Sequence, residues 1–196
     1  FNKIEDDLRA IVPSIKRIKA RRVQMTLYEK KVISVNETRI PYNEPREVVG
    51  DELIFDTTSA SEIPAHAMSD GTLLALGVIT LMHSPESPRL ILLDDVEQGL
   101  HPLAQRQLVK TLKEFAEKRD KQILLTSHSG YITDELAPED VWVMRLDNEG
   151  ISRCKRLSDH HDAERLLQVL TTGELADAVG EDWVINPPVA TGAAND

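Results

Sequence analysis

The chain has 196 residues, the size of one ordinary domain, and 41% of them are hydrophobic. Its net charge of −10 argues against a general nucleic-acid coat, because phosphate binding requires clustered lysine and arginine. The single cysteine, Cys154, excludes an intramolecular disulfide, and no apolar run approaches the roughly 20 residues that cross a bilayer. Together these features favour a reducing, cytoplasmic location.

The first 60 residues are expected to form a helix and an antiparallel β region. Apolar side chains at positions 1, 4, 8, 11 and 12 have helical spacing, which Pro13 ends. Between residues 22 and 56, short β-like runs predict a small antiparallel sheet. Its turns are expected at Pro41, Asn43, Pro45 and Gly50.

A basic run, "KRIKARR", occupies residues 16–22 and carries five cationic side chains in seven positions. Such a run is most often a solvated face. The alternative is a contact with the DNA backbone, since cationic side chains neutralise phosphates.

Residues 61–184 have the pattern of an α/β lobe. Ser69 is a good N-cap for an apolar helix, and Asp70 lies in its first turn, where the helix dipole favours a negative charge. Aliphatic strands at 89–94 and 121–126, with a helix at 102–118 between them, form a βαβ unit. Continuous aliphatic strands predict a parallel sheet covered on both faces. A hairpin around "DNEG", a helix over 161–178 and a flexible tail at 185–196 complete the prediction.

Polar side chains follow both predicted strands. Asp94 and Asp95 end the first strand, and Thr126, Ser127 and His128 end the second. Parallel strands share a direction, so these residues meet at one edge of the sheet, where ligand sites form in open α/β sheets. Acids after a buried strand are costly unless they meet cations or donors. A hydrated Mg²⁺ would satisfy that need through oxygen ligands.

A third polar cluster, "MSDGT", occupies residues 68–72 at the start of the apolar helix. The free N–H groups of a first helical turn form an anion site, and Gly71 leaves room for a phosphate oxygen. Ser69 and Thr72 add hydroxyl donors. A capped, buried helix explains the same residues equally well.

Taken in order, the three clusters resemble the motifs of one ATPase family. "MSDGT" is similar to the signature motif of ABC-type ATPases. "LILLDDVEQGLHP", residues 90–102, resembles a Walker B strand running into a D-loop, and "ILLTSHS", residues 123–129, resembles the switch-histidine strand. The "GLHP" and "TSHS" details resemble the RecF-like and SMC-like branch, which includes OLD-family and many prokaryotic defence ATPases. The resemblance implies the C-terminal part of an ABC-type P-loop NTPase head, with a parallel βαβ core and a small antiparallel β region.

The resemblance also implies catalytic roles with ATP and Mg²⁺ as cofactors. Asp94 would hold the Mg²⁺ hydration shell. Asp95 would orient the attacking water, and His128 would contact the γ-phosphate. The reaction is in-line attack of water on a γ-phosphoryl group, driven by positioning and charge neutralisation.

The same resemblance implies a second ATPase head as partner, in a homodimer or higher oligomer. Ser69, Gly71 and Thr72 would bind the γ-phosphate of a nucleotide held by that partner. The expected D-loop residues at the interface are Gly99, Leu100 and His101.

Two departures from the family pattern bear on activity. Asp95 stands where the family usually has Glu, so its shorter arm predicts slow hydrolysis unless Glu97 assists. The phosphate-binding loop G-x-x-x-x-G-K-[ST], called Walker A, does not occur in the sequence. We therefore expect a segment or chain elsewhere to supply it, and weak ATP binding without it.

Three functions fit these motifs. The first is an ATPase half-head in DNA repair, DNA maintenance or antiphage defence, with DNA or a nuclease effector as further partner. The second is a non-catalytic dimerisation or regulatory module. The third is the ATPase part of an OLD-like nuclease system, whose Toprim domain would belong to a partner. His160, His161 and Asp162 suggest a metal site, although adjacent histidines on a helix point about 100° apart and favour a surface location.

Overall fold

The chain has a mixed α/β fold with one parallel strand pair and two antiparallel sheets, as the sequence predicts. The computed structural model describes residues 2–35 and 38–186. It divides into two compact units, Phe1–Leu76 and Gly77–Asp196. Among the described residues, no helix combines the length and the apolar character that a bilayer crossing requires. Most of the predicted tail at 185–196 lies outside the described residues.

The first unit begins with helix α1, Asn2–Ile11, which ends before Pro13 as predicted. Its apolar face buries Leu8 and Ile11 completely or nearly so. The Glu5 carboxylate accepts a hydrogen bond from the Ile18 backbone N–H at 2.8 Å. This bond and the buried face fix the helix against the first strand.

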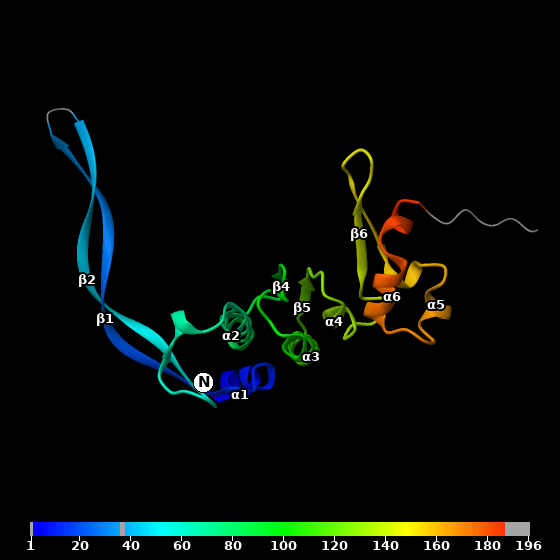
Figure 1. Ribbon diagram of the computed structural model, residues 1–196, viewed down its shortest axis with the longest axis horizontal. Coiled ribbons are helices and arrows are strands. Elements are labelled where there is room, and N and C mark those ends of the chain that lie inside the picture. Colours follow the sequence, from blue (N-terminus) through cyan, green and yellow to red (C-terminus); the bar gives the residue numbers. More distant parts are fainter. Residues whose placement is uncertain (1, 36–37, 187–196) are drawn as a thin grey trace, which may run out of the picture. The chain divides into compact units, whose positions relative to one another are not determined.

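The rest of the first unit is dominated by one long hairpin (Figure 1). Strand β1, Ile15–Val35, pairs antiparallel with β2, Thr38–Thr57, from Ile15↔Thr57 to Val35↔Thr38. The prediction of several short strands is therefore wrong, because the four expected turn residues all lie inside β2: Pro41, Asn43, Pro45 and Gly50.

Proline is tolerated in this part of β2 because it is an edge there, since the third strand of the sheet pairs only with Ile54 and Phe55. Pro41 and Pro45 are an even number of residues apart, so both occupy positions of the same parity. At alternate positions of an edge strand the N–H points away from the partner, and a proline there costs no ladder hydrogen bond. Composition alone does not reveal that parity.

Two short elements and a longer helix follow the hairpin. Strand β3, Ile63–Pro64, pairs with β2, and a 3₁₀ turn, η1, covers Ala65–Ala67. Helix α2 then runs over Asp70–His83. Its start agrees with the N-cap predicted at Ser69.

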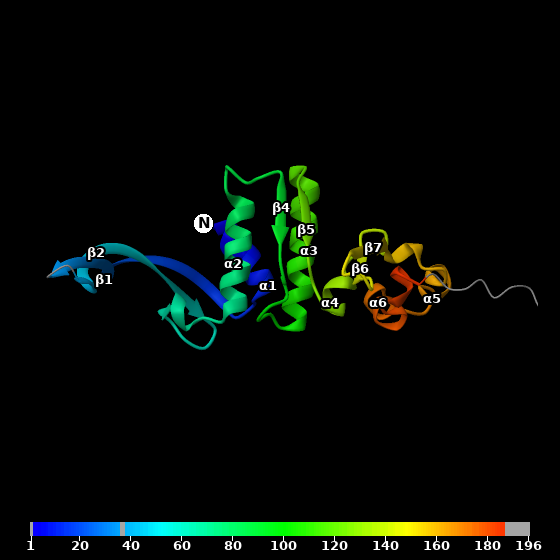
Figure 2. The same cartoon turned by 90° about the horizontal axis from the view of Figure 1, so that it is seen from above.

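The second unit contains the predicted βαβ arrangement. Strands β4, Leu90–Leu93, and β5, Gln122–Leu125, are parallel and joined by helix α3, Pro102–Arg119. Figure 2 shows α3 running alongside the two strands. The helix buries its apolar stripe, including Leu108 and Val109, and β4 buries Ile91.

The other face of this strand pair is exposed, which corrects the expectation that both faces are covered. Leu90, Leu92 and Leu124 are 50%, 65% and 61% exposed. In the described part of the chain, no third strand pairs with β4 or β5. The strands are therefore apolar on both faces, although the described residues cover only the face that packs against α3.

The unit ends in a hairpin and short helices. Helix α4, Gly130–Thr133, precedes the predicted hairpin, β6, Trp142–Leu146, with β7, Ser152–Arg156. The single helix predicted over 161–178 is wrong. In its place are η2, α5, α6 and η3, over Leu157–Asp159, Ala163–Leu166, Thr172–Val179 and Asp182–Val184. The helix restarts because Thr171 and Glu174 form a capping box.

Candidate functional site

The two acids after β4 are fixed by one threonine after β5. The Thr126 hydroxyl donates a hydrogen bond to Asp94 Oδ1 at 2.5 Å and accepts one from the Asp95 backbone N–H at 3.0 Å. A hydroxyl–carboxylate contact of this length is typical of a charge-assisted hydrogen bond. The parallel topology thus brings Asp94, Asp95 and Thr126 together at one edge.

Asp95 has an unusual backbone. Its φ is 47°, in the left-handed region that few residues other than glycine, asparagine and aspartate adopt readily. Its side chain is exposed. The local backbone therefore gives a physical reason for aspartate at this position, where the ATPase motif usually has glutamate.

Glu97 connects the first loop to the predicted switch histidine. Its Oε1 accepts a hydrogen bond from the His128 backbone N–H at 2.7 Å. Burial raises the pKa of Glu97, but the His128 N–H and its own backbone N–H outweigh burial and hold that pKa below its ordinary value. Glu97 is therefore an ionised carboxylate at neutral pH, and it lies in the same loop as Asp94 and Asp95.

The predicted D-loop residues have three different environments. Gly99 has φ 70°, which a glycine adopts without strain, and is exposed. Leu100 is only 9% exposed, so its side chain packs within its own chain. His101 is the N-cap of α3, and its Nδ1 accepts from the Leu103 N–H at 3.4 Å. Gly99 and His101 are the exposed members of the loop.

One residue of this region was not predicted from the sequence. Gln105 is 8% exposed, and its Nε2 donates to the Leu100 carbonyl at 2.9 Å. Its Oε1 accepts a hydrogen bond from the Ser129 hydroxyl at 2.5 Å. The available signal was a polar residue on the apolar stripe of the helix, three positions before Leu108.

The signature-like residues lie at the start of α2, in the first unit. Ser69 Oγ accepts a hydrogen bond from the Thr72 backbone N–H at 3.3 Å and lies 2.8 Å from the Thr72 hydroxyl. Gly71 and Thr72 are buried. The capped-helix interpretation therefore holds for this segment, and the phosphate-binding interpretation stays a prediction.

Each of the two clusters, taken by itself, offers donor atoms of its own kind. Asp94 and Asp95 offer exposed carboxylate oxygens, which are the hard ligands that Mg²⁺ prefers directly or through water. The first turn of α2 offers hydroxyl groups and helix N–H groups, which suit phosphate oxygens.

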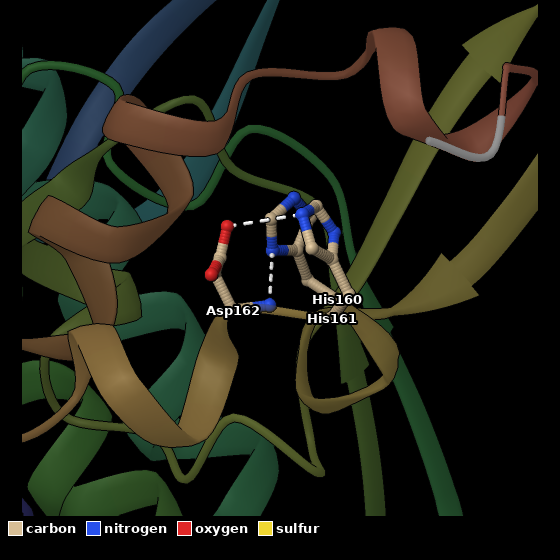
Figure 3. Close-up of side chains that lie close together, drawn as sticks. All are labelled: His160, His161 and Asp162. Atoms are coloured by element: carbon tan, nitrogen blue, oxygen red, sulfur yellow. Dashed lines mark hydrogen bonds and ion pairs between the residues drawn. The ribbon is translucent and has the colours of Figure 1, made fainter. Parts of the chain in front are cut away.

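A second cluster lies in the turn between η2 and α5 (Figure 3). The three side chains are in a turn and not on a helix, so the rings of His160 and His161 lie 4.3 Å apart. Outside the turn, the His160 ring packs edge-on against Trp183, and Arg165 pairs with Asp162 Oδ1 at 2.9 Å. His160 Nδ1 accepts from the Asp162 N–H at 3.2 Å, and His161 Nε2 lies 3.0 Å from Asp162 Oδ2. Because His160 Nδ1 already uses its lone pair, the neutral ring has a protonated Nε2 and no free ligand atom.

The basic run lies on β1 and faces acids on β2. Arg21 pairs with Glu52 at 2.7 Å, and Lys19 pairs with Asp56 at 2.6 Å. Such pairs lower the positive charge available to a phosphate backbone. The contacts favour the solvated-face interpretation over a DNA contact.

The comparison with protein families covers most of the chain. The model of a family described as "AAA domain, putative AbiEii toxin, Type IV TA system" matches residues 3–134. The chain belongs to this family. It is accordingly a nucleotide-binding ATPase domain, and the matched span includes every residue of the predicted site, from Ser69 to His128. Among curated proteins, none matches the sequence.

Solved structures give the same fold. One comes from a study described as "Structural biochemistry of ATP-driven dimerization and DNA stimulated activation of SMC ATPases", with a TM-score of 0.51 and 15% identity. That match covers 86% of this chain and 91% of the other. The second is the Smc head domain with a coiled coil and joint from Pyrococcus yayanosii, with a TM-score of 0.50 and 14% identity. It covers 85% of this chain but only 28% of the Smc chain. At these identities the likeness shows the fold alone.

Proposed function

We propose that this domain hydrolyses ATP with the residues at the carboxyl ends of β4 and β5. Asp94 holds the hydration shell of Mg²⁺, and Asp95 orients the attacking water. His128 contacts the γ-phosphate. The observation that carries the proposal is the Thr126 hydroxyl, which joins both acids across the strand ends.

Electrostatics support this assignment. Phosphoryl transfer is catalysed mainly by positioning and by neutralising charge on the phosphoryl oxygens. A short bond from Thr126 leaves Asp94 one free carboxylate oxygen with a fixed direction. The Glu97–His128 bond fixes the start of the second loop in the same way.

Dimerisation around ATP is the second part of the proposal. The partner head would present the N-terminal turn of its own α2, with Ser69, Gly71 and Thr72, to the nucleotide. Gly99 and His101 support a contact in the D-loop because both are exposed. One structural relative comes from a study of ATP-driven dimerization of SMC ATPases, which motivates the same expectation here.

A further segment or chain would supply the Walker A loop. The exposed leucines of the β4–β5 face support a docking place for it, since a two-stranded parallel sheet with one bare apolar face is incomplete on its own. DNA repair, DNA maintenance or antiphage defence is the proposed setting, with DNA or a nuclease effector as further partner.

The decisive experiment measures phosphate release from Mg²⁺·ATP by the full chain, with and without a polypeptide that carries the Walker A loop. Asp95→Asn is the sharpest variant, because asparagine keeps the size and tolerates φ near 50° while removing the charge. We expect turnover in the wild type and its loss in Asp95→Asn. Equal rates in both would remove Asp95 from the catalytic role.

A non-catalytic module is the second candidate, and the Asp95 position favours it specifically. The aspartate carboxylate is one methylene shorter than that of glutamate and sits on a left-handed backbone. Nucleotide-dependent dimerisation without phosphate release, in both the wild type and Asp95→Asn, would identify this function.

A further inference from the structure

Two hydrogen-bonded links join the loop after β4 to the loop after β5. The first is the bond from the His128 backbone N–H to Glu97 Oε1 at 2.7 Å. The second runs through Gln105, which accepts from Ser129 at 2.5 Å and donates to the Leu100 carbonyl at 2.9 Å. In the loop after β5 the links begin at the adjacent residues His128 and Ser129. In the loop after β4 they end at two separate residues, Glu97 and Leu100.

Glu97 is half-buried in the first link. Its second carboxylate oxygen, Oε2, is buried and has no hydrogen-bond partner among the described residues. Leaving a buried acceptor without a partner costs free energy. The hydrogen bond from the His128 N–H to the other carboxylate oxygen, Oε1, offsets this cost and holds the side chain in place.

Gln105 is a fixed connector. Its amide is buried in the apolar stripe of α3, and each end has its proper partner: the oxygen accepts and the nitrogen donates. A flipped amide would set its oxygen against the Leu100 carbonyl oxygen and lose that bond, so only one orientation satisfies the site. Gln105 therefore joins the Ser129 hydroxyl to the backbone of Leu100.

We propose that Glu97 and Gln105 are positioning residues that couple the His128 loop to the Gly99–His101 loop. Nucleotide contact at His128 then changes the loop that faces the second head, and contact at that loop changes His128. The coupling rests on the proposed function, because it assumes that His128 meets the γ-phosphate. It assigns a regulatory task to Glu97, which lies within the motif at residues 90–102, and to Gln105, which lies outside the expected motifs.

The Glu97 link is tested without nucleotide by amide NMR of the full chain. The His128 amide proton should lie downfield and exchange slowly with solvent, because the Glu97 carboxylate accepts it. Glu97→Ala removes the acceptor and should speed this exchange, whereas Glu97→Gln keeps an acceptor oxygen and should restore most of the protection. Equal exchange of the His128 amide in the wild type and Glu97→Ala would overturn this link.

The Gln105 link is tested by adding Mg²⁺ with a slowly hydrolysed ATP analogue. In the wild type, the amide signals of both His128 and Leu100 should shift. Ser129→Ala should keep the His128 shift and lose the Leu100 shift, whereas Ser129→Thr retains the hydroxyl and should restore it. Gln105→Glu keeps the acceptor for Ser129 but loses the donor to Leu100, so it should also lose the Leu100 shift.

The outcomes separate the coupling from the proposed function. A wild-type chain whose His128 signal is unchanged by the nucleotide contradicts the proposed function, while amide exchange of His128 in Glu97→Ala still decides the Glu97 link. A Leu100 shift that survives in both Ser129→Ala and Gln105→Glu contradicts the coupling alone. A Leu100 shift that is lost in those two variants and restored in Ser129→Thr supports it.

Discussion

The Thr126 hydroxyl donates a 2.5 Å hydrogen bond to Asp94 Oδ1, although the two residues follow different strands. The hydroxyl oxygen of Thr126 also accepts a hydrogen bond from the Asp95 N–H, so one side chain holds both acids. A threonine at the end of β5 thereby sets the geometry of residues at the end of β4. Its removal tests this arrangement directly.

Thr126→Val keeps the side-chain shape but removes both hydrogen bonds. We expect it to lower the free energy of unfolding by about 1–3 kcal/mol, since each of the two hydrogen bonds contributes a net ~0.5–1.5 kcal/mol, and Thr126→Ser to restore most of the loss. Urea denaturation measures the change. Thr111→Val is the matched control, because the Thr111 hydroxyl bonds only to its own helix, at Gln107 O, and should matter little. Equal effects at the two positions would contradict the bridging role.

Gly173 permits close contact between α6 and α4. A Cβ on Gly173 would lie 2.4 Å from the Gly130 carbonyl oxygen, which is backbone and cannot rotate away. Gly173→Ala should therefore destabilise the second unit by about 1–3 kcal/mol. Gly77→Ala is the control: a Cβ there meets nothing within 4 Å, and alanine should stabilise α2 by about 0.5–1 kcal/mol. Thermal unfolding of both variants distinguishes these opposite signs.

The capping box at α6 makes a separate prediction. Thr171 Oγ1 accepts from the Glu174 N–H at 3.3 Å, and Glu174 Oε2 accepts from the Thr171 N–H at 2.9 Å. Thr171→Ala should cost about 1 kcal/mol, while Thr171→Ser should cost much less. Chemical denaturation gives both values, and a harmless Thr171→Ala would show that the box does not stabilise the helix.

Asp134 predicts a specific loss of stability in acid. Burial raises its pKa, but the Thr171 hydroxyl, the Gly173 N–H and the Arg106 guanidinium together hold that pKa below its ordinary 3.8. A carboxyl whose pKa is lower in the folded state than in the unfolded state stabilises the protein when the pH is above the unfolded-state pKa. That contribution is lost as pH falls through the folded value.

The measurement is unfolding by urea in buffers from neutral pH to below the ordinary aspartate value. Asp134→Asn should be less stable at neutral pH and should lose less stability on acidification than the wild type. Asp140→Asn, at an exposed site, is the control and should follow the wild-type curve. Parallel curves for Asp134→Asn and the wild type would contradict the assignment.

Sequence patterns predict the parts of the fold that rest on local rules. The aliphatic strands, the N-cap at Ser69 and the stop before Pro13 follow from periodicity and capping, and the structure has all three. Parallel pairing of the two strands is then sufficient to place Asp94 near Thr126, because both residues follow the carboxyl ends of neighbouring strands.

The remaining features depend on contacts that a sequence pattern does not encode. Proline is typical of turns, so Pro41 and Pro45 predict turns from the sequence. Whether they fit into β2 instead depends on which backbone amides point away from the partner strand. The left-handed φ of Asp95 and the two bonds of Gln105 depend on loops that are distant in sequence. Such features become visible only when strand register and loop geometry are known.

The prolines of β2 also affect how the long ribbon meets other chains. Exposed apolar side chains, among them Leu27 at 52% and Val32 at 61%, make its surface attractive to another strand. Strand addition along an edge requires a continuous row of N–H donors, and Pro41 and Pro45 remove two of them. Residues typical of turns thus act as gatekeepers against edge-to-edge aggregation, and replacing them with valine should make the protein less soluble.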